Sequence, residues 1–134
     1  MTSARTILAA VALTAAGVLS PLGAPSAAAV TYCDAAIIWQ NAYVAGNSST
    51  LHPNCVSAQG AGPNNAVSSL QLSLRDCHYR TIGVDGRFGP ETKRVLASVQ
   101  AGLGIAADGV YGPQTARAMS HRRVGGGPCL RITF

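Results

Sequence analysis

The pattern of apolar and polar positions along the chain becomes clearly helical from residue 65 onward. Apolar side chains recur there on one face of an α-helix, at Val67, Leu70, Leu74 and Cys77. Asn64 or Asn65 can cap this helix, because an asparagine side chain accepts a hydrogen bond from an unpaired backbone N–H at a helix start. The pattern therefore predicts a first helix that begins at residue 65.

Two more helices are predicted, and each begins at a proline. Pro90 suits a first helical turn, since its missing N–H would be unpaired there in any case. The buried stripe of this second helix is predicted to be Val95, Leu96, Val99 and Leu103, and the helix ends at Gly102 and Gly104. The third helix starts at Pro113 and presents Ala116 and Met119 to the core. Its negative C-terminal end suits three basic or titratable side chains, His121, Arg122 and Arg123, before the Gly-Gly-Gly-Pro of residues 125–128 stops it.

The stretch before the first helix, residues 30–62, has a weaker pattern. The apolar residues 35–39 predict a short strand or one helical turn, and residues 50–52 predict a second short strand after a turn at 46–49. Residues 60–65 have the composition of a linker. Three aromatic side chains of this stretch, Tyr32, Trp39 and Tyr43, either line a ligand surface or pack as a small core.

The first 29 residues are organised like a secretory signal peptide. Arg5 supplies a positive charge, and the apolar run 6–19 is too short to cross a hydrocarbon core, which needs about 20 residues. Small side chains at Ala27–Ala29 suit a signal peptidase. We predict cleavage after Ala29, which releases a soluble mature chain with no membrane contact. An uncleaved anchor helix is the alternative.

The charge of the mature chain indicates the kind of partner it meets. Nine basic and five acidic residues give it a net charge of +4. For an exported protein this charge favours anionic wall polymers and acidic peptides over nucleic acid. The alternative is that the charge only keeps a small protein soluble.

Four cysteines lie in the mature chain: Cys33, Cys55, Cys77 and Cys129. An even count in an exported chain of this size predicts two disulfides, and three connectivities are possible. The competing interpretation is a zinc site made of His52, Cys55, Cys77 and His78. An oxidising compartment and the absence of a CxxC pair argue against zinc, and we expect no metal or other cofactor.

An internal repeat is the most informative feature of the sequence. Residues 85–96 recur as residues 108–119, an offset of 23 positions. In each copy an Asp-Gly pair predicts a turn with a positive-φ residue, an aromatic follows, and Gly-Pro opens a helix. The threonine two residues after the proline can bond back to the turn. The repeat implies a pseudo-twofold packing of the second and third helices over the first.

These residues together resemble the three-helix peptidoglycan-binding domain of bacterial cell-wall hydrolases. The resemblance covers residues 65–121 and rests on the first helix with its Leu70-Gln71 pair and on both Asp-Gly-x-aromatic-Gly-Pro-x-Thr motifs. It departs at Val99, where the family usually has Phe before the Gln. The implied fold is mainly α, a three-helix bundle with a small irregular or β N-terminal extension and two disulfides. The implied organisation is a signal peptide at 1–29, an N-terminal extension at 30–62, a peptidoglycan-binding domain at 63–123 and a C-terminal tail at 124–134 tied by a disulfide.

The flanks are similar to the wall-binding module that precedes the catalytic domain of actinomycete zinc D-alanyl-D-alanine carboxypeptidases. In that module the two outer cysteines pair. The resemblance therefore implies the disulfides Cys33–Cys129 and Cys55–Cys77. This pairing agrees with the tendency of the termini of compact domains to lie close together.

The resemblance also implies a ligand groove near the loops that lead into the first two helices. The candidate ligand-binding residues there are Asp85, Arg87, Phe88 and Tyr111. Arg87 can bind a stem-peptide carboxylate through two parallel hydrogen bonds, and Val110 at the equivalent place shows that the fold does not require it. A solvated Arg87 is the alternative. For Phe88 and Tyr111, packing as a core plug competes with ligand contact.

No set of residues in the sequence forms a recognisable catalytic motif. The three histidines of the chain stand outside any zinc-peptidase motif, and Asp85 and Asp108 sit in turns where Asp has a structural role. We expect a secreted, monomeric, non-catalytic module that binds peptidoglycan, through either its stem peptide or its glycan. The alternatives are an interaction module that regulates or inhibits a wall hydrolase or protease, and a structural component of a wall or spore surface.

Overall fold

The computed structural model describes residues 26–134 of the chain. The predicted signal peptide lies outside the described residues, except for its last four positions. Those four residues are exposed and have no regular structure. Within residues 26–134, no helix has the length and apolar character needed to cross a membrane.

The described residues form three helices and four strands. The elements in chain order are β1 (Ala35–Trp39), β2 (Ala42–Gly46), α1 (Asn65–Cys77), α2 (Pro90–Gly102), α3 (Pro113–Ala118), β3 (Ser120–His121) and β4 (Leu130–Arg131). The strands form two antiparallel two-stranded sheets, β1–β2 and β3–β4. The prediction of a mainly α fold is therefore wrong. The extension contributes a true hairpin, and the third helix is only six residues long.

The β1–β2 hairpin turns on two residues in the left-handed region, Gln40 at φ 49° and Asn41 at φ 66°. Two consecutive positive φ values are the geometry of a tight hairpin turn whose twist matches that of the strands. The strand predicted at residues 35–39 is confirmed, and it pairs with β2, which the sequence did not predict. The second strand predicted at residues 50–52 is wrong, because residues 48–51 form a turn that is closed by a single bridge between Asn47 and His52. In this turn Asn47 Oδ1 accepts hydrogen bonds from the backbone N–H groups of Ser49 and Thr50.

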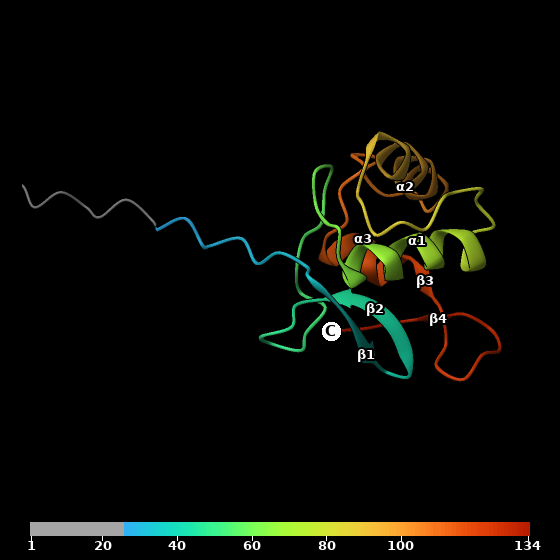
Figure 1. Cartoon of the computed structure of the whole chain (residues 1–134), viewed down its shortest axis with the longest axis horizontal. Helices are drawn as coiled ribbons and strands as arrows, with labels where there is room; N and C mark the ends of the chain where they lie inside the picture. Colours follow the sequence, from blue (N-terminus) through green and yellow to red (C-terminus); the bar gives the residue numbers. More distant parts are fainter. Residues whose placement is uncertain (1–25) are drawn as a thin grey trace, which may run out of the picture.

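Helix α1 lies at the centre of the molecule, between the hairpin and α2 (Figure 1). Its Asn64 cap is confirmed, since the Asn64 side chain accepts a hydrogen bond from the backbone N–H of Val67. The largest contacts of α1 are with β1 and β2, because Ile37 and Val44 turn their apolar side chains inward from the hairpin. The sequence predicted that the three helices pack together as a bundle. In the structure α1 packs mainly on the hairpin instead.

Helices α2 and α3 begin at the predicted prolines, and α2 ends at Gly102 as predicted, but one stripe residue of α2 and the end of α3 differ from the prediction. Leu103 lies just beyond α2 and is 37 % exposed, so it is not part of the buried stripe. Helix α3 stops at Ala118, because the backbone of Met119 is extended with ψ 157°. The chain then forms β3, which pairs with β4, so that His121 is a buried strand residue and not an exposed residue at a helix end.

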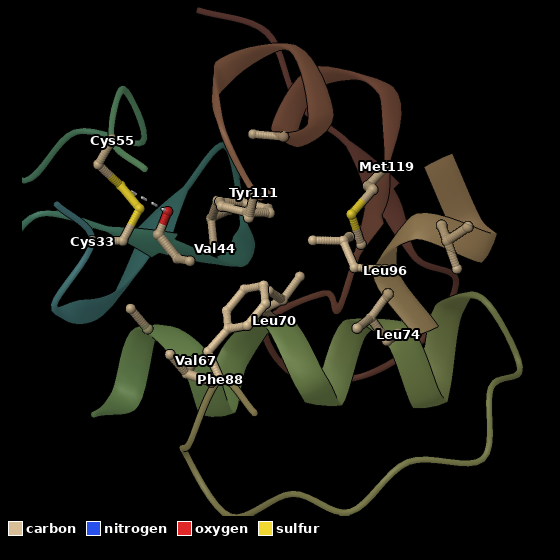
Figure 2. Packing of buried hydrophobic residues seen from close by; sticks show 14 of the residues in the cluster. Cys33, Val44, Cys55, Val67, Leu70, Leu74, Phe88, Leu96, Tyr111 and Met119 are labelled. Carbon is tan, nitrogen blue, oxygen red and sulfur yellow. Dashed lines mark hydrogen bonds between the residues drawn. A yellow bond between two sulfur atoms is a disulfide. The ribbon is translucent and has the colours of Figure 1, made fainter. Parts of the chain in front are cut away.

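One continuous core joins the hairpin to the helices. Phe88 and Tyr111 from the two repeats point into the same core as Val44 of the hairpin and Leu70 of α1 (Figure 2). Both aromatic rings are buried, at 1 % and 0 % exposure, as the core-plug interpretation predicted. The extension is therefore part of the folding unit.

Backbone hydrogen bonds also attach the extension to both repeats. The N–H and C=O of Ser57 pair with those of Tyr111 at 2.8 Å each. Phe88 is held in the same way by residues 60 and 61, at 2.8 and 2.9 Å. The predicted linker at residues 60–65 is thus structured: residues 60–64 form a strap along the first repeat, and Asn65 begins α1.

The two disulfides are Cys33–Cys55 and Cys77–Cys129. Two disulfides were predicted correctly, but the pairing Cys33–Cys129 with Cys55–Cys77 is wrong. Cys33 lies beside Cys55 because its backbone N–H donates to Val56 C=O at 2.9 Å. The C-terminal tail is tied by a disulfide as expected, but through Cys129 to the end of α1.

The burial of His121 predicts a loss of stability in mild acid. Burial lowers the pKa of His121 to about 4 and also lowers the pKa of half-buried His78. An unfolded histidine titrates near pH 6.5, so between pH 6.5 and 4 the unfolded state binds more protons than the folded state. The stabilisation from neutral His121 is present above pH 6.5 and is lost as the pH falls toward 4, by about 3 kcal/mol at most.

Urea unfolding at pH 7 and pH 4.5 measures this loss directly. We expect a lower free energy of unfolding at pH 4.5, and a smaller pH dependence in His121→Gln than in the parent protein. Equal pH dependence in the two proteins would contradict the assignment to His121.

Candidate functional site

A buried glutamine on α1 holds the first motif loop, residues 85–92. Gln71 Nε2 donates to Asp85 Oδ1 at 2.9 Å, to the carbonyl of Arg87 at 3.0 Å and to Thr92 Oγ1 at 3.2 Å. Its Oε1 accepts from the backbone N–H groups of the Asp-Gly pair at 3.1 and 2.9 Å. The Gln71 side chain is 1 % exposed. A buried amide needs such partners, so the loop has one favoured position on the helix.

The second motif loop, residues 108–115, is held by Gln100 of α2 in the same way. Gln100 Nε2 donates to Asp108 Oδ1 at 2.9 Å, to the carbonyl of Val110 at 2.9 Å and to Thr115 Oγ1 at 3.0 Å. Its Oε1 accepts from the Gly109 N–H at 2.8 Å. The structural repeat therefore includes the helix that precedes each loop, and not only the loop and the helix that follows.

The structural role of the two glutamines was missed by sequence reasoning, although a signal was present. Each glutamine directly follows a buried apolar residue of its helix, Leu70 or Val99, and precedes the Asp of its loop by 14 or 8 residues. The expected threonine bond to the turn is confirmed in both copies, at 3.4 and 3.3 Å. A polar residue within a buried helical stripe is the feature that could have indicated the interaction.

Positive φ at the loop glycines lets the loops approach the helices closely. Gly86 has φ 73° and Gly109 has φ 68°, as the Asp-Gly motif predicted. A Cβ at Gly86 would lie 2.9 Å from Ser68 Oγ and 3.1 Å from the Asn64 carbonyl. The first motif loop therefore rests on the first turn of α1.

The structure separates the four candidate ligand-binding residues into two pairs. Phe88 and Tyr111 are buried in the core and offer no surface to a ligand. Asp85 and Arg87 are exposed on the first motif loop. This arrangement brings only Asp85 and Arg87 together as a candidate surface.

Asp85 and Arg87 differ in whether their side chains form hydrogen bonds within the fold. Asp85 Oδ1 accepts from Gln71 and from the Arg87 backbone N–H, and these hydrogen bonds, the Gln71 bond first, lower the pKa of Asp85. Arg87 is held only through its backbone, and in the described part of the chain the ion pairs involve Asp76 and not Arg87. The Arg87 guanidinium is the group that the loop presents to solvent.

The three aromatic residues of the extension also separate. Trp39 packs edge-on to His52 and Phe134, with ring centroids 4.6 and 6.5 Å away, and its Nε1 donates to the Thr133 carbonyl at 3.0 Å. Tyr32 is exposed, and Tyr43 is 37 % exposed on the outer face of the hairpin. Trp39 is thus a packing residue, whereas Tyr43 remains available at the surface.

The residues of the alternative zinc site are not brought together. Cys55 and Cys77 belong to different disulfides, so their sulfur atoms cannot act as thiolate ligands. Among residues 26–134, no group of three or more His, Cys, Asp or Glu side chains could hold a metal ion.

Residues 63–119 match the family model described as "Putative peptidoglycan binding domain". The matched segment contains α1, α2, α3 and both motif loops. The chain thus contains a peptidoglycan-binding domain of this family, which confirms the resemblance drawn from the motifs. The β1–β2 hairpin and the β4 segment lie outside the match. Comparison with curated proteins and with solved structures found no match.

The two glutamines give a matched pair of substitutions. Gln71→Leu leaves two backbone N–H groups without their acceptor, whereas Gln100→Leu leaves one. An unsatisfied buried polar group costs about 1–3 kcal/mol, so we expect a larger loss of stability in Gln71→Leu, of roughly 2–4 kcal/mol. Urea unfolding of both variants measures the difference. If neither variant is less stable than the parent, the glutamines do not hold the loops.

Proposed function

We propose that the protein is a secreted, non-catalytic module that attaches to bacterial peptidoglycan through the domain at residues 63–119. The observation that carries this proposal is the family match over the segment that contains both motif loops. The attachment surface we propose is the first motif loop, with Arg87 as its anionic-ligand contact.

The Arg87 guanidinium suits a carboxylate of a wall stem peptide. A guanidinium donates two parallel hydrogen bonds to a carboxylate, which adds geometric specificity to the charge attraction. Gln71 fixes the loop by bonding to the Arg87 carbonyl, so less conformational entropy is lost when a ligand binds. Val110 occupies the same place in the second loop, which indicates that the fold itself does not need an arginine there.

The proposed location outside the cell rests on two further features. A wall-binding domain and two disulfides are typical of an extracellular or wall-associated protein, because disulfides persist in oxidising compartments. The signal-like N-terminus is the route by which we propose that the chain leaves the cell.

The proposed lack of catalysis rests on how the fold uses the three histidines. His121 is buried and bonds to the Ala116 carbonyl at 2.8 Å. His78 Nε2 accepts from the Ser120 N–H at 3.1 Å, and His52 Nδ1 accepts from the Asn54 N–H at 3.0 Å. Each imidazole therefore has a structural bond, and we assign none of them a role in general acid–base chemistry.

Sedimentation with purified insoluble peptidoglycan tests the proposal. We expect the protein to co-sediment, to release neither sugar nor peptide, and to bind more weakly as salt screens its positive charge. Arg87→Ala should weaken binding by about 1–3 kcal/mol, roughly 5- to 150-fold, because one charge-assisted contact is lost. Its stability should change little.

Arg123→Ala is the matched control, since it removes an equal charge from an exposed position outside the motif loops. It should retain most of the binding. A folded parent protein that stays in the supernatant at low salt would refute wall binding. Equal losses in the two arginine variants would show that only net charge matters.

A further inference from the structure

A groove of about 340 Å³ lies where the β1–β2 hairpin meets α1. Its walls come from the hairpin, from α1 and from the segment after α3: Ala36, Tyr43, Asn65, Ser68, Ser69, Leu72 and Arg122. The hairpin and Arg122 lie outside residues 63–119, so the matched segment alone would not form this groove. Its size falls within the range of small-ligand sites.

One side of the groove is an apolar and aromatic platform. Tyr43 lines the groove from β2, whereas its exposed cross-strand neighbour Ile38 is not one of the lining residues. Leu72 contributes an apolar side chain from α1. An exposed aromatic ring with apolar neighbours provides a flat surface on which a ligand with one apolar face can stack.

The remaining walls are polar and, apart from Arg122, uncharged. Asn65 and Ser68 offer an amide and a hydroxyl from the first turn of α1. The Ser69 hydroxyl is buried in the groove wall without a hydrogen-bond partner among residues 26–134. The Asn65 amide and the Ser68 hydroxyl suit the hydroxyl and amide groups of a neutral ligand.

Arg122 is the one charged residue in the lining, and it shares the carboxylate of Asp76 with Arg75. Its Nε lies 3.0 Å from Asp76 Oδ2, and its backbone carbonyl accepts from the Tyr43 N–H at 2.8 Å. The side chain is therefore held in place while its other N–H groups remain donors. A guanidinium held in this way can donate a hydrogen bond to a neutral carbonyl, such as that of an acetamide.

From these features we infer that the groove is a glycan subsite that binds an N-acetylated amino sugar, with the sugar face on Tyr43. The identity of the sugar as part of wall peptidoglycan rests on the proposed function. The groove also adjoins the proposed peptide contact, since Gly86 of the first motif loop packs on Ser68, which lines the groove. Glycan and stem peptide would then bind to neighbouring surfaces on the first turn of α1.

The probe for this site is a soluble β-1,4-linked tetramer of N-acetylglucosamine, titrated into the ¹⁵N-labelled protein. We expect saturable shifts of the amide resonances of Tyr43, Ser68 and Leu72. Tyr43→Ala should weaken binding about tenfold because the stacking surface is lost, whereas Tyr43→Phe should retain affinity within about threefold. Circular dichroism establishes that each variant is folded.

Tyr79→Ala is the matched control, because Tyr79 is 90 % exposed and is not part of the groove. It should bind the tetramer like the parent protein. The inference is overturned if shifts do not saturate by about 10 mM, if they fall outside the groove, or if Tyr79→Ala loses as much affinity as Tyr43→Ala. It is also overturned if a stem peptide without sugar occupies the groove in its place.

Failure of this inference and failure of the proposed function give different results. A parent protein that sediments with peptidoglycan while the tetramer leaves the groove unchanged refutes the glycan subsite alone. A tetramer that binds in the groove of a protein that does not sediment with peptidoglycan refutes the wall attachment and supports the sugar specificity of the groove.

Discussion

The hydrogen bonds of one buried glutamine amide determine how the first repeat is arranged. Gln71 is excluded from water on α1, and its amide finds its partners in the first motif loop. With that loop fixed, Phe88 enters the core, Pro90 begins α2, and the side chain of Arg87 is left outside. Gln100 repeats the arrangement for the second loop, with Tyr111 as the ring. The candidate ligand contact is therefore a consequence of how the fold satisfies a buried polar group.

The extension completes this arrangement and is not an appendage. Its hairpin covers the face of α1 that the other helices leave open. Its strap binds the backbone of Phe88, and Ser57 binds the backbone of Tyr111. The disulfide Cys33–Cys55 lies within the extension, and Cys77–Cys129 ties the C-terminal tail to the end of α1. The same hairpin creates the groove beside α1, so the residues that stabilise the core also extend the candidate surface beyond the matched domain.

Local patterns in the sequence predicted the parts of the fold that depend on local chemistry. Helical periodicity located α1, prolines located the starts of α2 and α3, and the Asp-Gly pairs located turns with positive φ. Strand β2 was missed because its turn, Gln40-Asn41, lacks the usual glycine, so nothing in the local sequence marked a hairpin. The predicted disulfide pairing was wrong, and the predicted third helix was too long. Both features depend on contacts with distant segments, such as β4.

The site was predictable to a similar extent. Comparison of the two repeats distinguished Arg87 from the core residues of its loop. Arg87 and Val110 occupy equivalent positions and differ, which indicates that the fold does not require a particular side chain there. The groove could not be found in this way, because Tyr43 and Leu72 meet only after the hairpin has packed on α1.

Hydrogen–deuterium exchange on the protein bound to insoluble peptidoglycan tests most directly that the surface around the first turn of α1 contacts the wall. The account predicts slower exchange than in the free protein at the first motif loop and at the outer strand residues of the hairpin, with no change at residues 103–107 and 124–128. Protection confined to those last two segments, or no protection in protein that is fully bound, would contradict it.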